Sequence, residues 1–268
     1  MMAAAVQRTT VLMYHALANA QLGAIAGADP HYAVSAATLA RHLSLARDRG
    51  LQLTSVAERL SDHSDARSVA LTFDDGHASN ALAADIVASG GGRADFFINS
   101  SLVGARHMLS WTELRTMYAA GMSIQSHGHT HRYLDAMQPH EVREELLRSK
   151  QMIEDGIGAP VLLFAPPGGR MQRDLPALAA SVGYAAVCSS NVGIWRLDSA
   201  AAEIPRFAVL SSTSDRQLLG WIEQQPLALA KARLRHALLR SAKRTLGTRR
   251  YEQLRATING AMAHPSDR

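Results

Sequence analysis

The alternation of short apolar segments with longer helical patterns constrains the fold more than any other feature. Apolar segments of four to six residues read as buried strands at 10–14, 69–73, 94–99, 122–125, 162–165 and 185–188. Helical patterns lie between them at 35–49, 80–89, 111–120, 139–153 and 173–181. Alternating strands and helices are typical of a parallel sheet. We therefore expect an α/β fold whose sheet is either open or closed into a barrel.

The composition excludes several classes of protein. The chain has 268 residues, of which 47% are hydrophobic and 19% are charged, so an extended disordered chain is excluded. A single cysteine excludes a disulfide framework and a cysteine-rich zinc cluster. We find no apolar stretch as long as a membrane span and no signal-peptide pattern in the first ten residues. A cytoplasmic location is expected.

The positive charge is concentrated at one end of the chain. Residues 226–268 contain ten basic and two acidic residues, a net charge of +8, whereas residues 1–225 contain 18 basic and 21 acidic residues. Apolar residues recur at helical spacing between the basic ones over 226–246, and a second short helix is expected at 249–258. We therefore predict a catalytic domain at 1–225 and a basic amphipathic helical tail at 226–268.

Two clusters of polar residues follow predicted strands. Asp74 and Asp75 come directly after 69–73, and neighbouring carboxylates at a strand end are costly unless a metal ion holds one of them ionised. An Asp-Asp-Gly surface turn is the alternative. His127 and His131, four residues apart, follow 122–125. Together with Asp75 they form a two-histidine, one-carboxylate set that suits hydrolytic zinc as well as non-haem iron, although incidental histidines in a loop are also possible.

These residues resemble a known family. Thr72-Phe-Asp-Asp-Gly76 and the His127–His131 pair resemble the first two motifs of the polysaccharide deacetylases, the NodB-homology family, and Phe164-Ala-Pro-Pro-Gly168 resembles the third. Ile204-Pro-Arg-Phe207 resembles a segment near the end of one subgroup. The resemblance covers roughly residues 10 to 210. It implies a distorted (β/α) barrel of about seven strands and a metal-dependent amide hydrolase that removes N-acetyl groups from sugars.

The resemblance also implies roles for individual residues. Asp74 would be the general base, Asp75, His127 and His131 the ligands of a divalent metal, most simply zinc, and the backbone N–H of Gly168 an oxyanion donor. These roles agree with the chemistry of metal-assisted hydrolysis, in which a metal polarises the acyl carbonyl and a carboxylate takes a proton.

Two departures from the family pattern affect the site. Many members have an arginine that orients the base where this chain has Ala165, and Arg206 is our candidate replacement; an ordinary surface or ion-pair arginine is the alternative. Most members also have a late Leu-x-His motif that supplies the general acid, and the match at 234–236 reads as chance. His15, after the first strand, resembles the general acid of the permuted poly-N-acetylglucosamine deacetylase subgroup. The alternative is a loop histidine that only forms hydrogen bonds with the backbone.

The function expected from the sequence is removal of an N-acetyl group from an amino sugar of a polysaccharide, oligosaccharide or glycolipid. One alternative is a deformylase or other carbon–nitrogen hydrolase that acts on a lipid- or nucleotide-linked sugar. Another is a degenerate barrel that binds carbohydrate without turnover, an alternative suggested by Ala165 and by the missing late histidine motif. Two interpretations of the tail remain open. It binds peripherally to an anionic membrane, such as the inner face of the cell membrane, or it forms a helical hairpin packed on the barrel. Nucleic acid is not expected, because few aromatic residues lie near the tail for base stacking.

Overall fold

A computed structural model describes residues 7–18, 26–62, 66–197, 202–239 and 241. It divides the chain into two compact units, 1–225 and 226–268, at the boundary between the expected catalytic domain and tail. In the first unit the longer strands are β1 (Arg8–Tyr14), β4 (Gln52–Thr54), β5 (Ser68–Phe73), β6 (Asp95–Ile98), β7 (Ser123–Ser126) and β9 (Ala186–Cys188). Two-residue strands are β2 (Leu17–Ala18), β3 (Val34–Ser35), β8 (Leu163–Phe164), β10 (Trp195–Arg196), β11 (Glu203–Ile204) and β12 (Phe207–Ala208).

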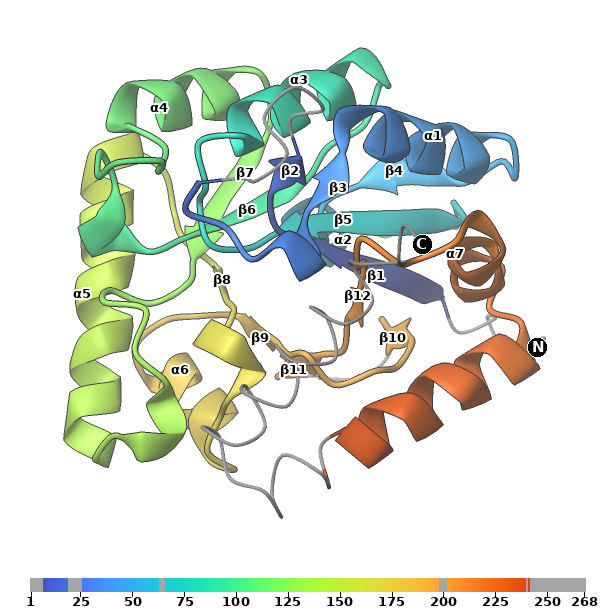
Figure 1. Cartoon of the computed structure of the whole chain (residues 1–268). Helices are drawn as coiled ribbons and strands as arrows, with labels where there is room; N and C mark the ends of the chain where they lie inside the picture. Colours follow the sequence, from blue (N-terminus) through green and yellow to red (C-terminus); the bar gives the residue numbers. More distant parts are fainter. Residues whose placement is uncertain (1–6, 19–25, 63–65, 198–201, 240, 242–268) are drawn as a thin grey trace, which may run out of the picture. The chain divides into compact units, whose positions relative to one another are not determined.

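Helices cover the outside of the sheet in the first unit (Figure 1). They are α1 (Ala36–Arg47), α2 (Val56–Ser61), α3 (Asn80–Ser89), α4 (Trp111–Ala119), α5 (Pro139–Ile157), α6 (Leu175–Ser181) and α7 (Asp215–Ile222). Short 3-10 turns are η1 (Pro30–Tyr32), η2 (Ser100–Leu102), η3 (Leu134–Ala136) and η4 (Pro167–Gly169). In the second unit, residues 226–239 are helical. The expected tail helix at 249–258 lies outside the described residues. No helix among the described residues has the length and apolarity needed to cross a bilayer.

The helices begin and end where the sequence provides caps. The side-chain oxygens of Ser35, Ser55 and Ser214 accept backbone N–H groups at the starts of α1, α2 and α7. Ser110 and Glu113 form the expected capping box of α4. The helix α5 runs four residues beyond our prediction. Gly156 lies inside the helix, where the Trp111 ring would be 2.3 Å from a β-carbon and leaves room only for glycine. The left-handed Gly158, at φ 75°, ends the helix.

The main sheet is parallel and nearly closes on itself. Its order is β10-β1-β5-β6-β7-β8-β9-β11, with β4 also paired to β5 and β12 to β1; the β1–β10 pair is antiparallel. The register of β1 against β5 runs from Thr10 opposite Val69 to Tyr14 opposite Phe73. Only Pro205 and Arg206 separate β11, at one end of the order, from β12, which pairs with β1. The expected distorted barrel is therefore confirmed, with additional short strands that we did not predict.

Alternate residues of the strands fill the barrel with small and medium-sized apolar side chains. The buried cluster includes Val11, Ala70, Phe97, Leu163 and Cys188. Parallel strands buried on both faces need such near-continuous apolar sequences, which is why these segments stood out in the sequence. The polar residues that follow the strands are left at the carboxyl edge of the sheet, where the active sites of parallel α/β folds lie.

Candidate active site

Three side chains with metal-binding atoms meet at the carboxyl edge of the sheet. One ligand atom each from Asp75, His127 and His131 lies within 4.8 Å of the other two. The Asp75 Oδ1 atom is 3.2 Å from His127 Nε2 and 3.3 Å from His131 Nε2. Asp75 follows β5 and both histidines follow β7, so the two sequence clusters do converge. Two imidazole nitrogens and one carboxylate oxygen are a donor set that fits a divalent ion with open coordination positions.

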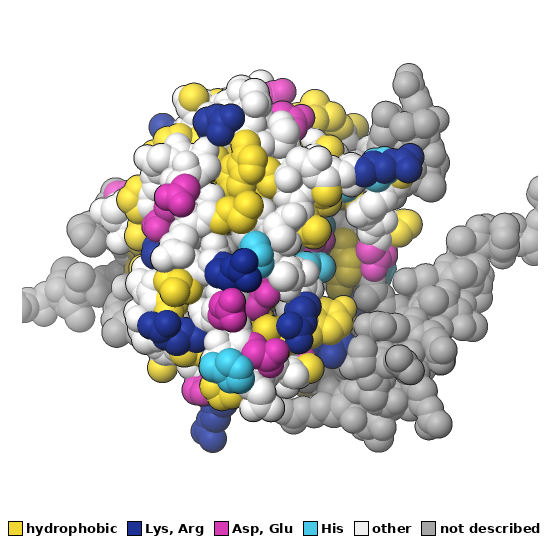
Figure 2. All heavy atoms as spheres, turned by 90° about the vertical axis from the view of Figure 1, so that its left-hand side faces the viewer, with side chains coloured by type: hydrophobic (Ala, Val, Ile, Leu, Met, Phe, Trp, Pro, Cys, Tyr) yellow, Lys and Arg dark blue, Asp and Glu magenta, His cyan; other side chains and the backbone are white. Residues whose placement is uncertain are grey.

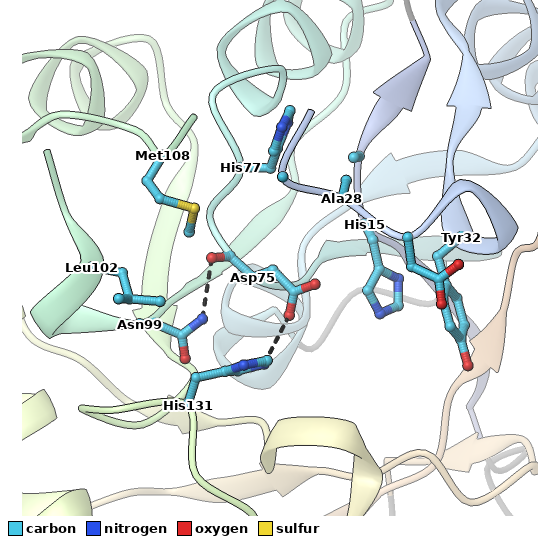
Figure 3. A pocket seen from close by; sticks show the side chains of 12 residues that line it. His15, Ala28, Tyr32, Asp75, His77, Asn99, Leu102, Met108 and His131 are labelled. Carbon is cyan, nitrogen blue, oxygen red and sulfur yellow. Dashed lines mark hydrogen bonds and ion pairs between the residues drawn. The ribbon is translucent and has the colours of Figure 1, made fainter. Parts of the chain in front are cut away.

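The backbone at Asp75 takes an uncommon conformation to bring the carboxylate into this position. Asp75 has φ 77°, in the left-handed region that aspartate tolerates better than most residues, and Gly76 follows at φ 72°. The Asn99 side-chain nitrogen donates to the Asp75 carbonyl oxygen at 3.2 Å (Figure 3). A β-carbon at Gly76 would lie 3.1 Å from the Ile98 side chain. Neighbouring β6 therefore fixes the turn that presents Asp75.

The hydrogen bond of His127 leaves one ring nitrogen available to a metal. His127 is buried, and its Nδ1 atom lies 2.8 Å from the carbonyl oxygen of Ala165. A carbonyl oxygen can only accept, so Nδ1 donates to it, and Nε2 is the nitrogen left to face Asp75 and a metal ion. Metal-binding histidines are commonly oriented by such a bond from the other nitrogen. The third motif therefore contributes through its backbone, at the position where the family arginine is missing.

A buried glutamate on α5 holds the loop that carries both histidines. Glu145 Oε2 accepts the backbone N–H groups of His129 at 3.0 Å and Thr130 at 2.9 Å, and Oε1 accepts the Thr130 hydroxyl at 2.7 Å. One turn further along α5, the Ser149 hydroxyl donates to the Gly128 carbonyl at 2.9 Å. Four hydrogen bonds thus fix the backbone between the two histidines. Sequence analysis did not identify Glu145, although it stands in the buried stripe of α5 with Val142, Leu146, Ser149 and Ile153.

The Glu145→Gln variant is expected to bind zinc about 10- to 100-fold more weakly than the wild type, because one amide nitrogen must replace an acceptor oxygen facing N–H or O–H donors. Titration of metal-free protein against a competing chelator measures this affinity. The matched control is Glu144→Gln, which alters an exposed glutamate on the same helix that pairs with Arg148. Unchanged zinc affinity in Glu145→Gln, with the fold intact by circular dichroism, would contradict a positioning role for Glu145.

Asp74 and Arg206 form a buried two-point ion pair beside this set. The guanidinium Nη1 lies 2.7 Å from Asp74 Oδ1 and Nη2 lies 2.8 Å from Oδ2; Arg206 is fully buried and Asp74 is 3% exposed. Arg206 also donates to the Ser189 carbonyl oxygen and to the Thr72 hydroxyl, both at 3.1 Å. It reaches Asp74 because it stands in the two-residue link between β11 and β12 that nearly closes the barrel. Arg206 is therefore not a surface residue.

The two aspartates keep low pKa values for different reasons. Burial acts to raise the pKa of Asp74, but the Arg206 charge, together with His127, holds it below its ordinary value. Burial also opposes ionisation of Asp75, whose pKa is held well below its ordinary value by hydrogen bonds from His127 and His131. Both carboxylates are therefore ionised at neutral pH, so one can accept a proton while the other binds a cation.

His15 lies on the opposite side of a pocket from His131. The pocket measures about 140 Å³, and its lining includes His15, Tyr32, Asp75, His77, Met108 and His131. Figure 3 shows the His15 imidazole between Asp75 and Tyr32, and its ring centroid is 4.4 Å from that of Tyr32. Its Nδ1 atom has no hydrogen-bond partner among the described residues. Burial lowers the pKa of His15 although Asp75 and Asp74 act in the opposite direction.

Gly168 lies in the turn η4, which follows β8. It has φ 62°, and a β-carbon there would lie 2.6 Å from the Tyr133 ring, so the position admits no larger residue without rearrangement. The neighbouring Pro167 would contact a β-carbon on Gly128 at 3.7 Å, which places η4 alongside the histidine loop. The third motif therefore belongs to the same edge as the other site residues.

Comparison with known proteins identifies the same motifs. The model of the polysaccharide deacetylase family matches residues 61–187. A Bacillus subtilis (strain 168) protein named "Putative polysaccharide deacetylase YxkH" is 25% identical over 158 residues, which are 59% of this chain and 57% of that protein. This chain therefore matches little more than half the length of that relative.

Solved structures share the fold. The structure described as "the putative polysaccharide deacetylase BA0330 from bacillus anthracis" superposes with a TM-score of 0.72 at 24% identity, over 81% of this chain and 69% of that one. The Streptococcus pyogenes deacetylase PplD, solved with acetate, superposes with a TM-score of 0.71 at 23% identity, over 81% of this chain and 99% of that one. Over residues 61–187 the chain is therefore similar to the polysaccharide deacetylases, and it shares the fold of these solved structures.

Proposed function

We propose that this chain is a metal-dependent hydrolase that removes an N-acetyl group from an amino sugar of a polysaccharide, oligosaccharide or glycolipid. The observation that carries the proposal is the pairing of Asp74 with Arg206 directly beside the Asp75, His127 and His131 set. It provides an ionised, fixed carboxylate next to a metal-binding set, as base-assisted amide hydrolysis requires. The match of residues 61–187 to the polysaccharide deacetylase model supports the acetyl group as the one released.

Asp75, His127 and His131 would hold the ion, and zinc suits their nitrogen and oxygen atoms best. A divalent ion in this position supplies a Lewis acid that polarises the acetyl carbonyl and makes water more acidic. Asp74 takes the proton of the attacking water through the oxygens that Arg206 holds in place. Asp75 is ionised but turned toward the histidines, so the two neighbouring carboxylates have separate tasks.

His15 and Gly168 complete the proposed reaction. His15 lines the same pocket as Asp75 and His131, and its lowered pKa makes the protonated ring a stronger acid toward the leaving amine. The Gly168 backbone N–H would donate to the oxyanion that forms on the acetyl carbonyl. Gly168 takes a left-handed conformation, which glycine adopts without strain.

The same residues bear on the two alternative functions, a degenerate barrel and a deformylase. The degenerate-barrel interpretation rested on Ala165 and on the missing late histidine motif. The contact between Arg206 and Asp74 weakens the first reason, and the second depends on whether His15 supplies the acid. A deformylase or another carbon–nitrogen hydrolase on a lipid- or nucleotide-linked sugar would use the same site. Its distinction from a deacetylase therefore depends on the acyl group and carrier that the enzyme accepts.

A substrate panel tests the proposal. Purified protein with zinc is incubated with N-acetylglucosamine oligomers, nucleotide sugars and lipid-linked sugars, and acetate and formate are measured. We expect acetate release from at least one N-acetylated substrate, abolished by a chelator and restored by added zinc. Formate without acetate would favour the deformylase, and sugar binding without either product would favour the degenerate barrel.

A further inference from the structure

The helix at 226–239, here called the tail helix, exposes a row of leucines that the catalytic proposal does not use. Leu227 is 78% exposed, and Leu234 and Leu238 are each 62% exposed. Positions seven and four residues apart lie on one face of an α-helix, so the three side chains form a single apolar stripe. Leu229 on another face is buried. The tail helix thus presents three leucines on one face.

The charges around this stripe all have the same sign. Lys231, Arg233 and Arg235 are exposed, and Lys231 stands between Leu227 and Leu234 on the leucine face. No acidic residue occurs from Pro226 to Tyr251. The surface over α5 is different, because acidic and basic side chains are interspersed there and Arg148 pairs with Glu144 (Figure 2). A surface complementary to the tail helix must therefore be both apolar and negatively charged.

We propose that the tail helix binds in the interface of an anionic lipid bilayer, with Leu227, Leu234 and Leu238 among the acyl chains and Lys231, Arg233 and Arg235 at the lipid headgroups. Amphipathic helices with basic residues beside an apolar face bind in this way. The long aliphatic stem of Lys231 allows its ammonium group to reach the headgroups from within the leucine row. An anionic protein groove or a second copy of the chain is the competing occupant. The proposal does not depend on the deacetylase activity.

Vesicle sedimentation of the full chain tests the proposal. We expect binding to phosphatidylcholine vesicles that contain 30 mol% phosphatidylglycerol, chosen as a probe, and little binding to pure phosphatidylcholine. The triple variant Leu227→Ser/Leu234→Ser/Leu238→Ser should bind at least ten-fold more weakly. Lys231→Gln/Arg233→Gln/Arg235→Gln should bind on the order of a hundred-fold more weakly at low salt, since each basic residue near an anionic surface contributes a few-fold or more.

The matched control removes three exposed apolar side chains from the first unit, in Leu82→Ser/Met152→Ser/Leu162→Ser. It should bind vesicles as the wild type does. No binding of the wild type to anionic vesicles, or equal binding of the leucine variant, would overturn the proposal. If light scattering shows that the wild type is a dimer and the leucine variant a monomer, and neither binds vesicles, the occupant is a second copy of the chain.

Discussion

The Asp74→Asn variant is expected to lose about a thousand-fold in kcat while it keeps its affinity for zinc. General bases contribute roughly 10²- to 10⁴-fold to rates, and a neutral amide cannot accept the proton of the attacking water. The proposed metal ligands are Asp75, His127 and His131, none of which changes. The measurement pairs kcat from acetate release with a zinc titration of the metal-free variant.

Asp75→Asn is the contrasting variant. It replaces a carboxylate that lies within 3.3 Å of both histidines, so it should lose zinc affinity and activity together. Zinc affinity therefore distinguishes the two aspartates, because only the Asp75 variant should lose it. If Asp74→Asn retained the kcat of the wild type, Asp74 would not be the base. If it lost zinc affinity as strongly as Asp75→Asn, the assignment of the ligands would be wrong.

Long helices and strands with clear start and stop residues could be predicted from the sequence, and two-residue strands could not. The helix α3 has the predicted bounds, 80–89, because three glycines follow it, and the Ser110–Glu113 capping box marks the start of α4. The strands β10, β11 and β12 have two residues each, too few to show any periodicity. Their pairing depends on partners far away in the sequence, as for β12 against β1. The near-closure of the barrel was therefore implied only by the family resemblance.

The same distinction applies to the site. Asp74, Asp75, His127 and His131 were recognisable because each pair is adjacent or closely spaced after a strand. Arg206 lies 132 residues from Asp74, and only the β11–β12 link brings the two together. Glu145 was overlooked as one of several acidic residues on an amphipathic helix. Its signal was present, because an acidic residue within an apolar stripe must have buried partners to remain stable.

Arg206→Met is expected to destabilise the protein by about 3 to 5 kcal/mol at neutral pH, because it leaves the Asp74 carboxylate buried without its counter-charge. Methionine keeps much of the side-chain volume, so the lost stability reflects the missing positive charge more than a new cavity. Restoring neutrality in Asp74→Asn/Arg206→Met should recover part of the stability. Chemical denaturation of the wild type, both single variants and the double variant gives the coupling energy between the two side chains.

The pH dependence separates this electrostatic effect from a packing effect. In the wild type the pKa of Asp74 is lowered, so its stabilisation is present above the pKa of the unfolded chain and is lost as pH falls through the folded value. Without Arg206, burial raises that pKa, and the folded state becomes less stable as pH rises. The difference in unfolding free energy between wild type and Arg206→Met should therefore grow toward pH 7 and shrink as pH falls through the lowered pKa of Asp74. If the difference in unfolding free energy stayed constant between acid and neutral pH, Arg206 would act by filling space in the link between β11 and β12. Its proposed role in orienting Asp74 would then be wrong.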